Sequence, residues 1–588
     1  MTFTEGGTRV GITKKLKRGM RVVRAAARAS AYVSGYYGEL RERSVVLYAA
    51  NGGEEIRAIE GELRANPAYS DFRVTVVHEE SCRCAREMGS AKYLIAGGAL
   101  PDWFTKREDQ VLAVIGTMPE GRGYAMGGIQ RTYLNSDYIL CDGESMRAAI
   151  AETYFLDGLY QGRYVLGSDA AERCARVLRD VPAGAEIPAR RSEREKVLIF
   201  VNGLHQNGLT TALRNLWGML DHAQRDYYIS FPSKSLADDP SRLDMLPGGA
   251  RYIPMPHMRQ ESLAEKLAFQ LYLKKNVTSP RAMRYVERYL ERLYQRSFRG
   301  CGFDWVIDHN GYDTCVLNML RVIPAKTAVY VHNDMKHELE TRRNQHKPTL
   351  QRVYRDCDRV VPVTRDIAES VAWLSGRTDN IHVVNNFHDW RDVRERAELP
   401  AAFEPATRSN MTLERIMELL EGSGLKFISI GRYSPEKNHM ELLEAFERFH
   451  RERPDSRLIL IGGRGVLYEE TLRRAAALDC ADSVALILTM RNPMPILKRC
   501  DLFILPSLYE GQGLVLLEAD TLGVPVVSTD VPGPRGFMRE HGGRLIPLGA
   551  DSLYQAMRDF AEKRWEPLNV DYDAYNRIAA EQFEKLFD

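Results

Sequence analysis

Short apolar runs rich in β-branched residues alternate with stretches of helical periodicity along the whole chain. Runs of this length, bounded by turn residues, predict buried strands, and their alternation with helices predicts parallel sheets with helices on both faces. The runs fall into three groups, separated by stretches rich in charged residues and proline at 181–195 and 391–424. We therefore predict an α/β chain with three Rossmann-like domains.

The three groups of runs predict domains at 1–180, 196–390 and 425–588. Two consecutive Rossmann-like lobes leave a cleft at the carboxyl ends of their sheets, and we expect the active site in the cleft of the second and third domains. The predicted strands are 44–49, 72–78, 92–97, 110–116 and 137–141 in the first domain; 196–201, 227–231, 304–308, 326–331, 359–364 and 381–386 in the second; and 425–431, 457–463, 483–488, 501–507, 524–529 and 544–548 in the third.

Composition narrows the class of protein only slightly. A formal net charge of +2 over 588 residues gives no reason to expect nucleic acid as a partner. The nine cysteines are odd in number, scattered and without C-x2-C spacing, which favours a reducing cytosol over disulfides or zinc. The sequence has neither an apolar run of 18 residues nor a recognisable leader, so we expect a cytoplasmic protein.

One local segment departs from this balance. Residues 9–28 carry eight cations and no acid, with Leu16, Met20, Val23 and Ala27 on one helical face. A basic amphipathic helix of this kind binds anionic lipid, which would make the protein peripheral on the inner face of the plasma membrane. The alternative is a solvated surface helix docked on the first domain.

The most informative motif lies in the third domain, in the sequence SLYEGQGLVLLEAD (507–520). Glu510 lies in a glycine-rich turn after a predicted buried strand, and Glu518 lies inside the helix that Gly511 and Gly513 open. The free N–H groups and positive dipole end of a helix N-terminus suit a diphosphate. A carboxylate at Glu518 can accept hydrogen bonds from ribose hydroxyls, whereas Glu510 at the tip faces the sugar. The simpler interpretation is a pair of solvated surface acids.

This segment resembles the E-x7-E signature of retaining GT-B glycosyltransferases, the family 4-like group. The sequence GRYSPEKN (431–438) is similar to that family's diphosphate-binding loop, so the resemblance gives Arg432 and Lys437 that role. IGGRG (461–465) and NPMPILKRCDLFILPS (492–507) also match in order. We include Leu514, next to Gly513, in the donor-binding set. The resemblance covers 425–588 and implies a GT-B fold preceded by a third domain.

The second domain contributes further candidates. Gly208 follows a predicted strand and opens a helix, where the family has a loop over the donor or acceptor. His332 ends another strand, where the family places a histidine near the reacting sugar; a purely structural histidine is the alternative. Residues 308–310 are weaker candidates for acceptor contact. Since no cluster with metal-ligand spacing is visible, we expect no metal and no cofactor beyond the nucleotide diphosphate sugar.

The first domain resembles the N-terminal domain of teichoic-acid glycerophosphotransferases over 90–104, 110–117, 133–140 and 160–163. Where that family has His-Gly-Thr, with the histidine as general base, this chain has Ile115, Gly116 and Thr117. Isoleucine cannot transfer a proton, so we expect a non-catalytic domain. It serves acceptor binding, membrane placement or assembly, or it is purely structural.

Together these patterns predict a retaining glycosyltransferase that moves a hexose-type unit from a nucleotide diphosphate sugar to a bacterial cell-surface polymer precursor, a glycan or polyol-phosphate polymer. The alternatives are a polyol-phosphate transferase, against which Ile115 argues, and a non-catalytic glycan-binding scaffold. A scaffold is expected to have lost the donor residues, yet Arg432, Lys437, Glu510 and Glu518 are all present.

Overall fold

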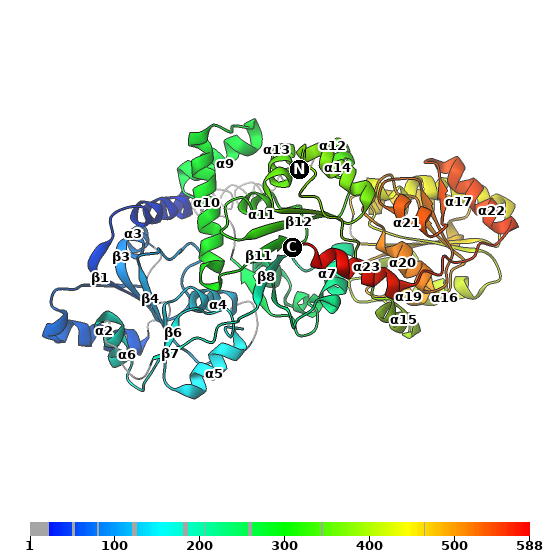
Figure 1. The fold of residues 1–588 in the computed structure, drawn as a ribbon. Coiled ribbons are helices and arrows are strands. Elements are labelled where there is room, and N and C mark those ends of the chain that lie inside the picture. Colours follow the sequence, from blue (N-terminus) through cyan, green and yellow to red (C-terminus); the bar gives the residue numbers. More distant parts are fainter. Residues whose placement is uncertain are drawn as a thin grey trace, which may run out of the picture. The chain divides into compact units, whose positions relative to one another are not determined.

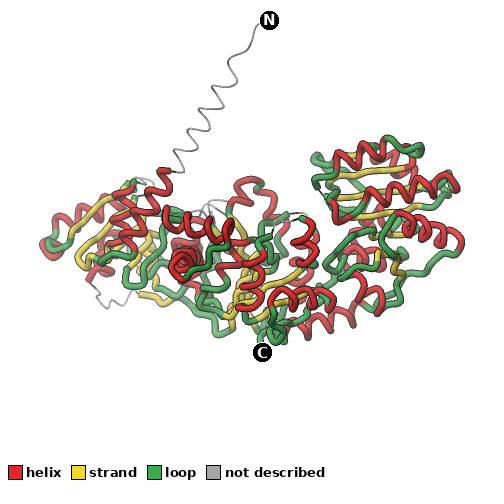
Figure 2. Tube along the Cα trace, turned by 90° about the horizontal axis from the view of Figure 1, so that it is seen from above, coloured by secondary structure: helices red, strands yellow, loops and turns green. Residues whose placement is uncertain are grey.

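The structure is a computed structural model that describes residues 23–49, 53–78, 81–119, 121, 126–179, 186–205, 207–256, 261–342, 345–463 and 465–588. The chain forms two compact units, and Figure 1 labels its helices and strands. Unit 1 comprises Met1–Leu204, Asp221–Ile307 and Asp313–Thr327, and unit 2 comprises His205–Leu220, Asp308–Tyr312 and Ala328–Asp588. Figure 2 shows the strands as yellow layers between red helices, as the alternating pattern predicts.

The first sheet has the strand order β2-β1-β3-β4-β5-β6-β7 and is parallel except for β7, which pairs antiparallel with β6. Its first five strands follow the doubly wound order 2-1-3-4-5. A helix spans residues 23–36. The further elements are β1 Arg41–Tyr48, α2 Glu54–Ala65, η1 Pro67–Tyr69, β2 Arg73–Val77, α3 Cys82–Ser90, β3 Ala91–Ala96, β4 Val111–Ile115, α4 Met126–Leu134, β5 Tyr138–Cys141, α5 Glu144–Thr153, β6 Arg163–Leu166, α6 Ala170–Arg179 and β7 Glu186–Pro188.

The second sheet has the order β10-β9-β8-β11-β12-β13, which is the Rossmann order 3-2-1-4-5-6. Its elements are β8 Glu195–Phe200, α7 Gly208–Met219, β9 Arg225–Pro232, α8 Lys234–Asp238, η2 Pro240–Met245, β10 Tyr252–Met255, α9 Leu263–Lys275, α10 Pro280–Phe298, η3 Arg299–Cys301, β11 Trp305–Asp308, α11 Thr314–Met319, β12 Lys326–Val331, α12 Met335–Thr341, α13 Lys347–Asp356, β13 Arg359–Pro362 and α14 Arg365–Ser375.

The third sheet repeats the Rossmann order in β17-β16-β15-β18-β19-β20, with β14 added antiparallel at the β17 edge. Its elements are α15 Trp390–Glu398, β14 Arg408–Ser409, α16 Leu413–Glu421, β15 Lys426–Ile430, η4 Pro435–Lys437, α17 His439–Glu452, β16 Arg457–Gly462, α18 Tyr468–Ala476, η5 Ala481–Ser483, β17 Val484–Leu488, α19 Met494–Leu497, β18 Leu502–Leu505, α20 Leu514–Thr521, β19 Val526–Thr529, α21 Pro534–Glu540, β20 Arg544–Ile546, α22 Ala550–Glu562 and α23 Tyr572–Glu584.

The predicted fold class is confirmed, because the chain is α/β and contains three largely parallel, Rossmann-like sheets. One predicted strand, 381–386, is wrong: only Ile381 forms a bridge, to Val360. The His382 and Val384 N–H groups still donate to the Val360 and Pro362 carbonyls of β13, at 2.9 and 3.1 Å. The next two N–H groups, of residues 385 and 386, donate to the side-chain oxygens of Gln582 and Gln512, at 2.9 and 3.2 Å. The stretches 181–195 and 391–424, predicted as linkers, contribute β7, α15, β14 and α16.

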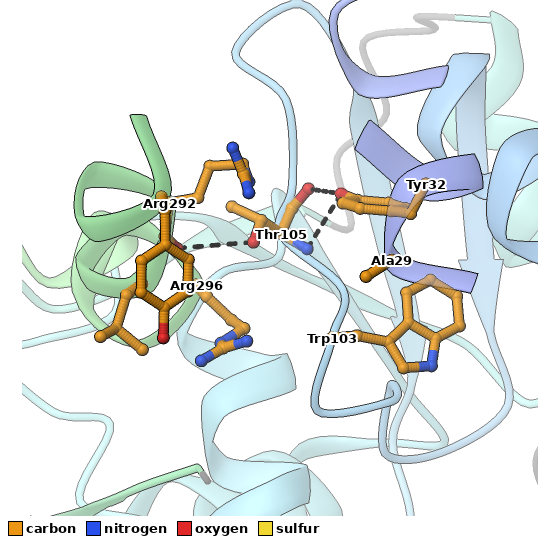
Figure 3. A pocket seen from close by; sticks show the side chains of 8 residues that line it. Ala29, Tyr32, Trp103, Thr105, Arg292 and Arg296 are labelled. Carbon is orange, nitrogen blue, oxygen red and sulfur yellow. Dashed lines mark hydrogen bonds between the residues drawn. The ribbon is translucent and has the colours of Figure 1, made fainter. Parts of the chain in front are cut away.

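The helix of residues 23–36 packs within unit 1 through its buried Ala26, Ala29 and Tyr32. Figure 3 shows Tyr32 beside Trp103, with ring centroids 5.3 Å apart, and the Thr105 backbone N–H donating to the Tyr32 hydroxyl at 3.0 Å. Val23, placed by the sequence on an apolar face, is 68% exposed. Most of the predicted basic segment, residues 9–22, lies outside the described residues.

Two buried arginines of α10 line the pocket shown in Figure 3. Arg292 donates to both carboxylate oxygens of Glu265 at 2.7 Å. Arg296 is only 4% exposed, and its Nε and Nη2 have no hydrogen-bond partner among the described residues. Burial lowers the pKa of Arg296 to about 10. In the described part of the chain, no helix is both long enough and apolar enough to span a membrane.

Candidate functional site

The candidate site lies where the strand order of the third sheet reverses, between β15 and β18. Ligands of open α/β sheets bind beyond the carboxyl ends of the strands at this point. The two loops that follow these strands, 431–438 and 506–513, are joined by a hydrogen bond from the Leu508 N–H to the Glu436 carbonyl at 2.8 Å. The sequence candidates Arg432, Lys437 and Glu510 lie on these two loops.

Lys437 and Glu510 form an ion pair across the two loops. The Lys437 Nζ lies 2.5 Å from the Glu510 Oε1, and the two side chains are only 13% and 11% exposed. Lys437 ends η4, and Asn438 follows it with φ of 51°, which turns the chain into α17. The site therefore holds a largely buried cation whose neighbour is an acid, at the position where the sequence predicts both.

Arg432 belongs to a second polar network. Its other members, Glu436 and Arg342, were not among the sequence candidates. The Arg432 Nη2 lies 3.0 Å from Oε1 of the buried Glu436, and Arg342 lies 3.7 Å from the same oxygen. Burial raises the pKa of Glu436. Hydrogen bonds from Ser434 and the backbone, together with the charges of Arg432 and Arg342, outweigh burial and hold this pKa below its usual value. Glu436 therefore stays ionised and fixes both guanidinium groups.

A further buried acid, Glu338, anchors the loop after β18. Glu338 is fully buried, and it accepts hydrogen bonds from the Tyr509 hydroxyl at 3.1 Å and the Asn333 side-chain amide at 3.3 Å. Arg342, four residues on, lies 3.4 Å from the other oxygen of Glu338. Sequence reasoning missed Glu338 and Arg342. Their only signal is an acid and a cation at i,i+4 spacing after a strand, which is common on exposed helices.

The glycines of the loop permit a close approach that no other residue allows. A Cβ at Gly511 would lie 1.8 Å from the His332 carbonyl oxygen, and one at Gly533 would lie 2.0 Å from the Gly511 carbonyl oxygen. Gly513 has φ of 77° and begins α20 without a side-chain cap, so Leu514 is the first helical residue. The N-terminal N–H groups of α20 are therefore not satisfied by a capping side chain.

Glu518 has a different environment within the same helix. Burial raises its pKa to about 7, with a smaller increase from Asp392 and an opposing effect of Arg396, both on α15. The structure thus brings Lys437, Glu510, Gly511 and His332 together, whereas the electrostatic partners of Glu518 come from α15. A group with this pKa changes charge near neutral pH.

His332 follows β12 and lies beside His309, with ring centroids 4.7 Å apart. Burial lowers the pKa of His332 to about 4 and that of His309 well below its usual value. Both imidazoles are therefore neutral at neutral pH. The His332 Nε2 has no hydrogen-bond partner within the described residues, which leaves it available as an acceptor or donor.

The other candidates of the second domain lie in two places. Gly208 is exposed at the start of α7, where the Asn207 side chain accepts from the Thr210 N–H and a Cβ at Gly208 would have no neighbour within 4 Å. Residues 308–310, the weaker candidates for acceptor contact, are all at least 92% buried. Asp308 Oδ1 accepts from the Asn310 and Gly311 N–H groups, both at 3.1 Å.

In the first domain, an apolar side chain occupies the position where the resembled family has its histidine base. Ile115 ends β4, is 1% exposed and belongs to the hydrophobic core of that domain, and the Gly116 N–H donates to the Leu140 carbonyl at 2.8 Å. A base is therefore absent at residue 115 in structure as well as in sequence. Across the described ranges no group of three or more His, Cys, Asp or Glu side chains is arranged to hold a metal ion.

Comparison with known proteins places the C-terminal residues in a family. Residues 413–577 match the family model "Glycosyl transferases group 1", so this part of the chain is a glycosyltransferase group 1 domain. The matched residues include all the candidates on the loops after β15 and β18, and α20 with Glu518. Gly208 and His332 lie outside them.

The names of two similar proteins describe transferases that act on bacterial glycan precursors. The chain is 31% identical over 160 residues to an Escherichia coli UDP-Gal:alpha-D-GlcNAc-diphosphoundecaprenol alpha-1,3-galactosyltransferase, covering 26% of this chain and 41% of that protein. It is 30% identical over 181 residues to a Campylobacter jejuni N-acetylgalactosamine-N,N'-diacetylbacillosaminyl-diphospho-undecaprenol 4-alpha-N-acetylgalactosaminyltransferase, covering 30% and 48%. The chain thus spans less than half the length of these relatives.

A solved structure with a similar backbone is Anabaena HepE in complex with UDP and glucose. The comparison covers 66% of this chain and 96% of that chain, with 14% identity and a TM-score of 0.46.

Proposed function

We propose that the chain is a retaining glycosyltransferase that transfers a sugar from a nucleotide diphosphate sugar to a bacterial cell-surface polymer precursor. The observation that supports this most is the meeting of Lys437 and Glu510 at the switch point of the third sheet, beside an uncapped helix N-terminus. The glycosyltransferase group 1 match over the same residues supports the same chemistry.

The donor diphosphate is bound by the two cations and the start of α20. Arg432 and Lys437 offset the negative charge that develops on the leaving diphosphate, which is the main electrostatic demand of the reaction. The N–H groups of Gly513 and Leu514 lie at the positive end of the helix dipole, which suits the diphosphate. Glu518 accepts hydrogen bonds from the ribose hydroxyls, and Glu510 faces the donor sugar.

The donor sugar reacts beside the loop that contains His332. Gly511 packs against the His332 carbonyl, which links the donor loop to the loop after β12. His332, neutral at the pH of the cytosol, hydrogen-bonds the reacting sugar. The bond from the anomeric carbon to the leaving phosphate breaks, and a bond to the acceptor oxygen forms on the same face. The leaving phosphate takes the acceptor proton, so the reaction needs no protein base.

The acceptor is a glycan or polyol-phosphate polymer attached to a lipid carrier. The names of the E. coli and C. jejuni relatives specify diphosphoundecaprenol-linked acceptors, which supports this class. Such an acceptor lies at the cytoplasmic leaflet, where the basic segment 9–28 and the non-catalytic first domain help to place the enzyme. Gly208, at the start of α7, lies on the side of the second domain that meets donor or acceptor.

Polyol-phosphate transfer is the weaker alternative because the position of its base holds the buried Ile115. A non-catalytic scaffold is opposed by the Lys437–Glu510 pair, which is intact at the proposed donor site.

The test is a screen of nucleotide diphosphate sugars against the purified chain, by thermal stabilisation and by slow release of nucleoside diphosphate. We expect one donor to give both signals, with unchanged release in EDTA because no metal takes part. NMR of the glycosylated product of a soluble acceptor analogue should show the anomeric configuration of the donor. An inverted product would refute retention, and EDTA inhibition reversed by Mg²⁺ or Mn²⁺ would refute metal independence.

A further inference from the structure

Helix α9 presents apolar side chains on two opposite faces. One face, with Ala268 and Tyr272, is buried in unit 1. The other is a stripe of Leu263, Leu267 and Leu271, which are 61%, 59% and 37% exposed. Their i, i+4, i+8 spacing places them in one line along the helix, on the side where a helix of a soluble protein is normally polar.

Exposed cations follow this stripe at its C-terminal end, whereas Glu261 and Glu265 lie on either side of Leu263 in sequence. Residues 266–286 contain five cations and no acidic residue, and four of the five, Lys274, Lys275, Arg281 and Arg284, are exposed. They cluster at the end of α9 and the beginning of α10, which Figure 1 shows as neighbouring helices. The acid that precedes the stretch, Glu265, is buried and neutralised by Arg292.

The same surface adjoins the helix of residues 23–36. The Leu263 N–H donates to the Ser30 Oγ at 3.3 Å, which fixes the start of α9 against that helix. Val23 is 68% exposed and Arg24 is exposed as well. The first leucine of the stripe therefore lies beside the helix of residues 23–36, whose exposed Val23 and Arg24 belong to the segment that the sequence predicts to bind lipid.

We propose that α9 and the start of α10 form an anionic-membrane docking surface, made of Leu263, Leu267, Leu271, Lys274, Lys275, Arg281 and Arg284. Helix α9 lies in the plane of the interface, with its three leucines at the acyl boundary and the cations at lipid phosphates. A second copy of the chain is a poorer occupant, because two surfaces of this composition repel each other.

This inference does not rest on the proposed function, since it concerns binding to a lipid surface without donor or acceptor. It also differs from the role predicted for residues 9–28, because the leucines that enter the lipid belong to α9. The two can be separated by leaving residues 9–28 intact in every variant.

The first experiment measures sedimentation of the full chain with vesicles of phosphatidylcholine, with and without phosphatidylglycerol. The triple variant Leu263→Gln, Leu267→Gln, Leu271→Gln should bind anionic vesicles about 100-fold more weakly, from about fivefold per exposed leucine. The control is Leu399→Gln with Leu548→Gln, which removes leucines of similar exposure, 55% and 52%, elsewhere on the chain. Unchanged circular dichroism shows that α9 persists.

The second experiment removes charge instead of apolar surface. Lys274→Gln with Lys275→Gln should weaken binding about fivefold per cation at low salt, whereas the exposed pair Lys563→Gln with Lys585→Gln should not. The difference should vanish near 1 M salt, where the Debye length falls to about 3 Å. Vesicle binding indifferent to the leucine and lysine variants would overturn the proposal. So would a wild-type chain that binds no vesicles and forms dimers that the triple leucine variant abolishes.

Discussion

At the scale of single residues, the pairing of Lys437 with Glu510 gives the sharpest expectation. Lys437→Ala removes one preorganised positive charge from the site, and turnover at saturating donor should fall about 100-fold. The matched control is Lys498→Ala, because Lys498 also lies 2.5 Å from a carboxylate, that of Glu398, but on the exposed surface. Steady-state kinetics of both variants provide the measurement. Equal turnover in Lys437→Ala and wild type, with normal folding, would remove this lysine from the mechanism.

Glu518 gives a pH-dependent prediction whose sign follows from burial. Its pKa is about 7 in the folded chain and about 4.5 in the unfolded chain, so folding favours the protonated acid. The stability from this group is present below pH 4.5 and is lost as the pH rises through 7. Glu518→Gln stays neutral, and should raise the free energy of unfolding by up to ~3 kcal/mol near pH 8 and leave it unchanged near pH 4.5. Urea unfolding at both pH values provides the comparison.

The same variant should bind the donor about 10-fold to 100-fold more weakly near pH 8, because hydrogen bonds to an ionised group contribute about 1.5–3 kcal/mol. A Glu518→Gln chain that is less stable than wild type near pH 8, or that binds donor equally well, would contradict this account of the residue.

The buried arginines Arg292 and Arg296 differ in their partners, so their replacement should affect stability in different ways. Arg292→Met leaves Glu265 buried without its partner, which should lower stability by about 3–5 kcal/mol. Arg296→Met removes a buried guanidinium whose Nε and Nη2 are unpaired, so stability should be unchanged or raised. Thermal unfolding distinguishes the two. A comparable loss in both variants would mean that Arg296 has a counter-charge in solution.

At the scale of elements, the loop between β18 and α20 depends on glycine at one position and tolerates a side chain at another. Gly511→Ala must displace the His332 carbonyl, so it should destabilise the chain by about 1–3 kcal/mol and abolish donor turnover. Gly208→Ala meets no neighbour and favours the first turn of α7, so stability should be equal or up to ~1 kcal/mol higher. Urea unfolding and donor release of the two variants test this contrast, which Gly511→Ala with wild-type activity would refute.

Much of the element order could be predicted from the sequence, because parallel strands that are buried on both faces have nearly continuous apolar sequences. The strands β6, β7, β10 and β14 were not predicted; β7 and β14, of three and two residues, are too short to form an apolar run. β10 is four residues long and contains Pro254. The predicted strand at 381–386 pairs with β13 only as far as residue 384. The last two backbone N–H groups donate to Gln582 and Gln512, which only the tertiary fold brings there.

The candidate site likewise contains residues that could be predicted from the sequence and residues that could not. Lys437 and Glu510 were predicted for one site because their loops resemble the diphosphate-binding loop and the E-x7-E signature of one family, and the structure pairs them. The network of Glu338, Tyr509 and Arg342 was not predicted, since it joins α12 to a loop far along the chain. The pKa of Glu518 is raised mainly by burial and is then modified by charges on α15, part of a stretch predicted as a connector.

At the scale of the whole molecule, we propose that the C-terminal glycosyltransferase group 1 domain holds a nucleotide diphosphate sugar by its diphosphate. Calorimetric titration of nucleoside diphosphates and monophosphates into wild type and into Arg432→Ala with Lys437→Ala tests it most directly. One diphosphate should bind wild type at a 1:1 ratio, with the monophosphate and the double variant each binding at least ~10²-fold more weakly because the charge-assisted contacts are lost. Folded wild type that binds no nucleoside diphosphate, or a double variant that binds it equally well, would contradict the claim.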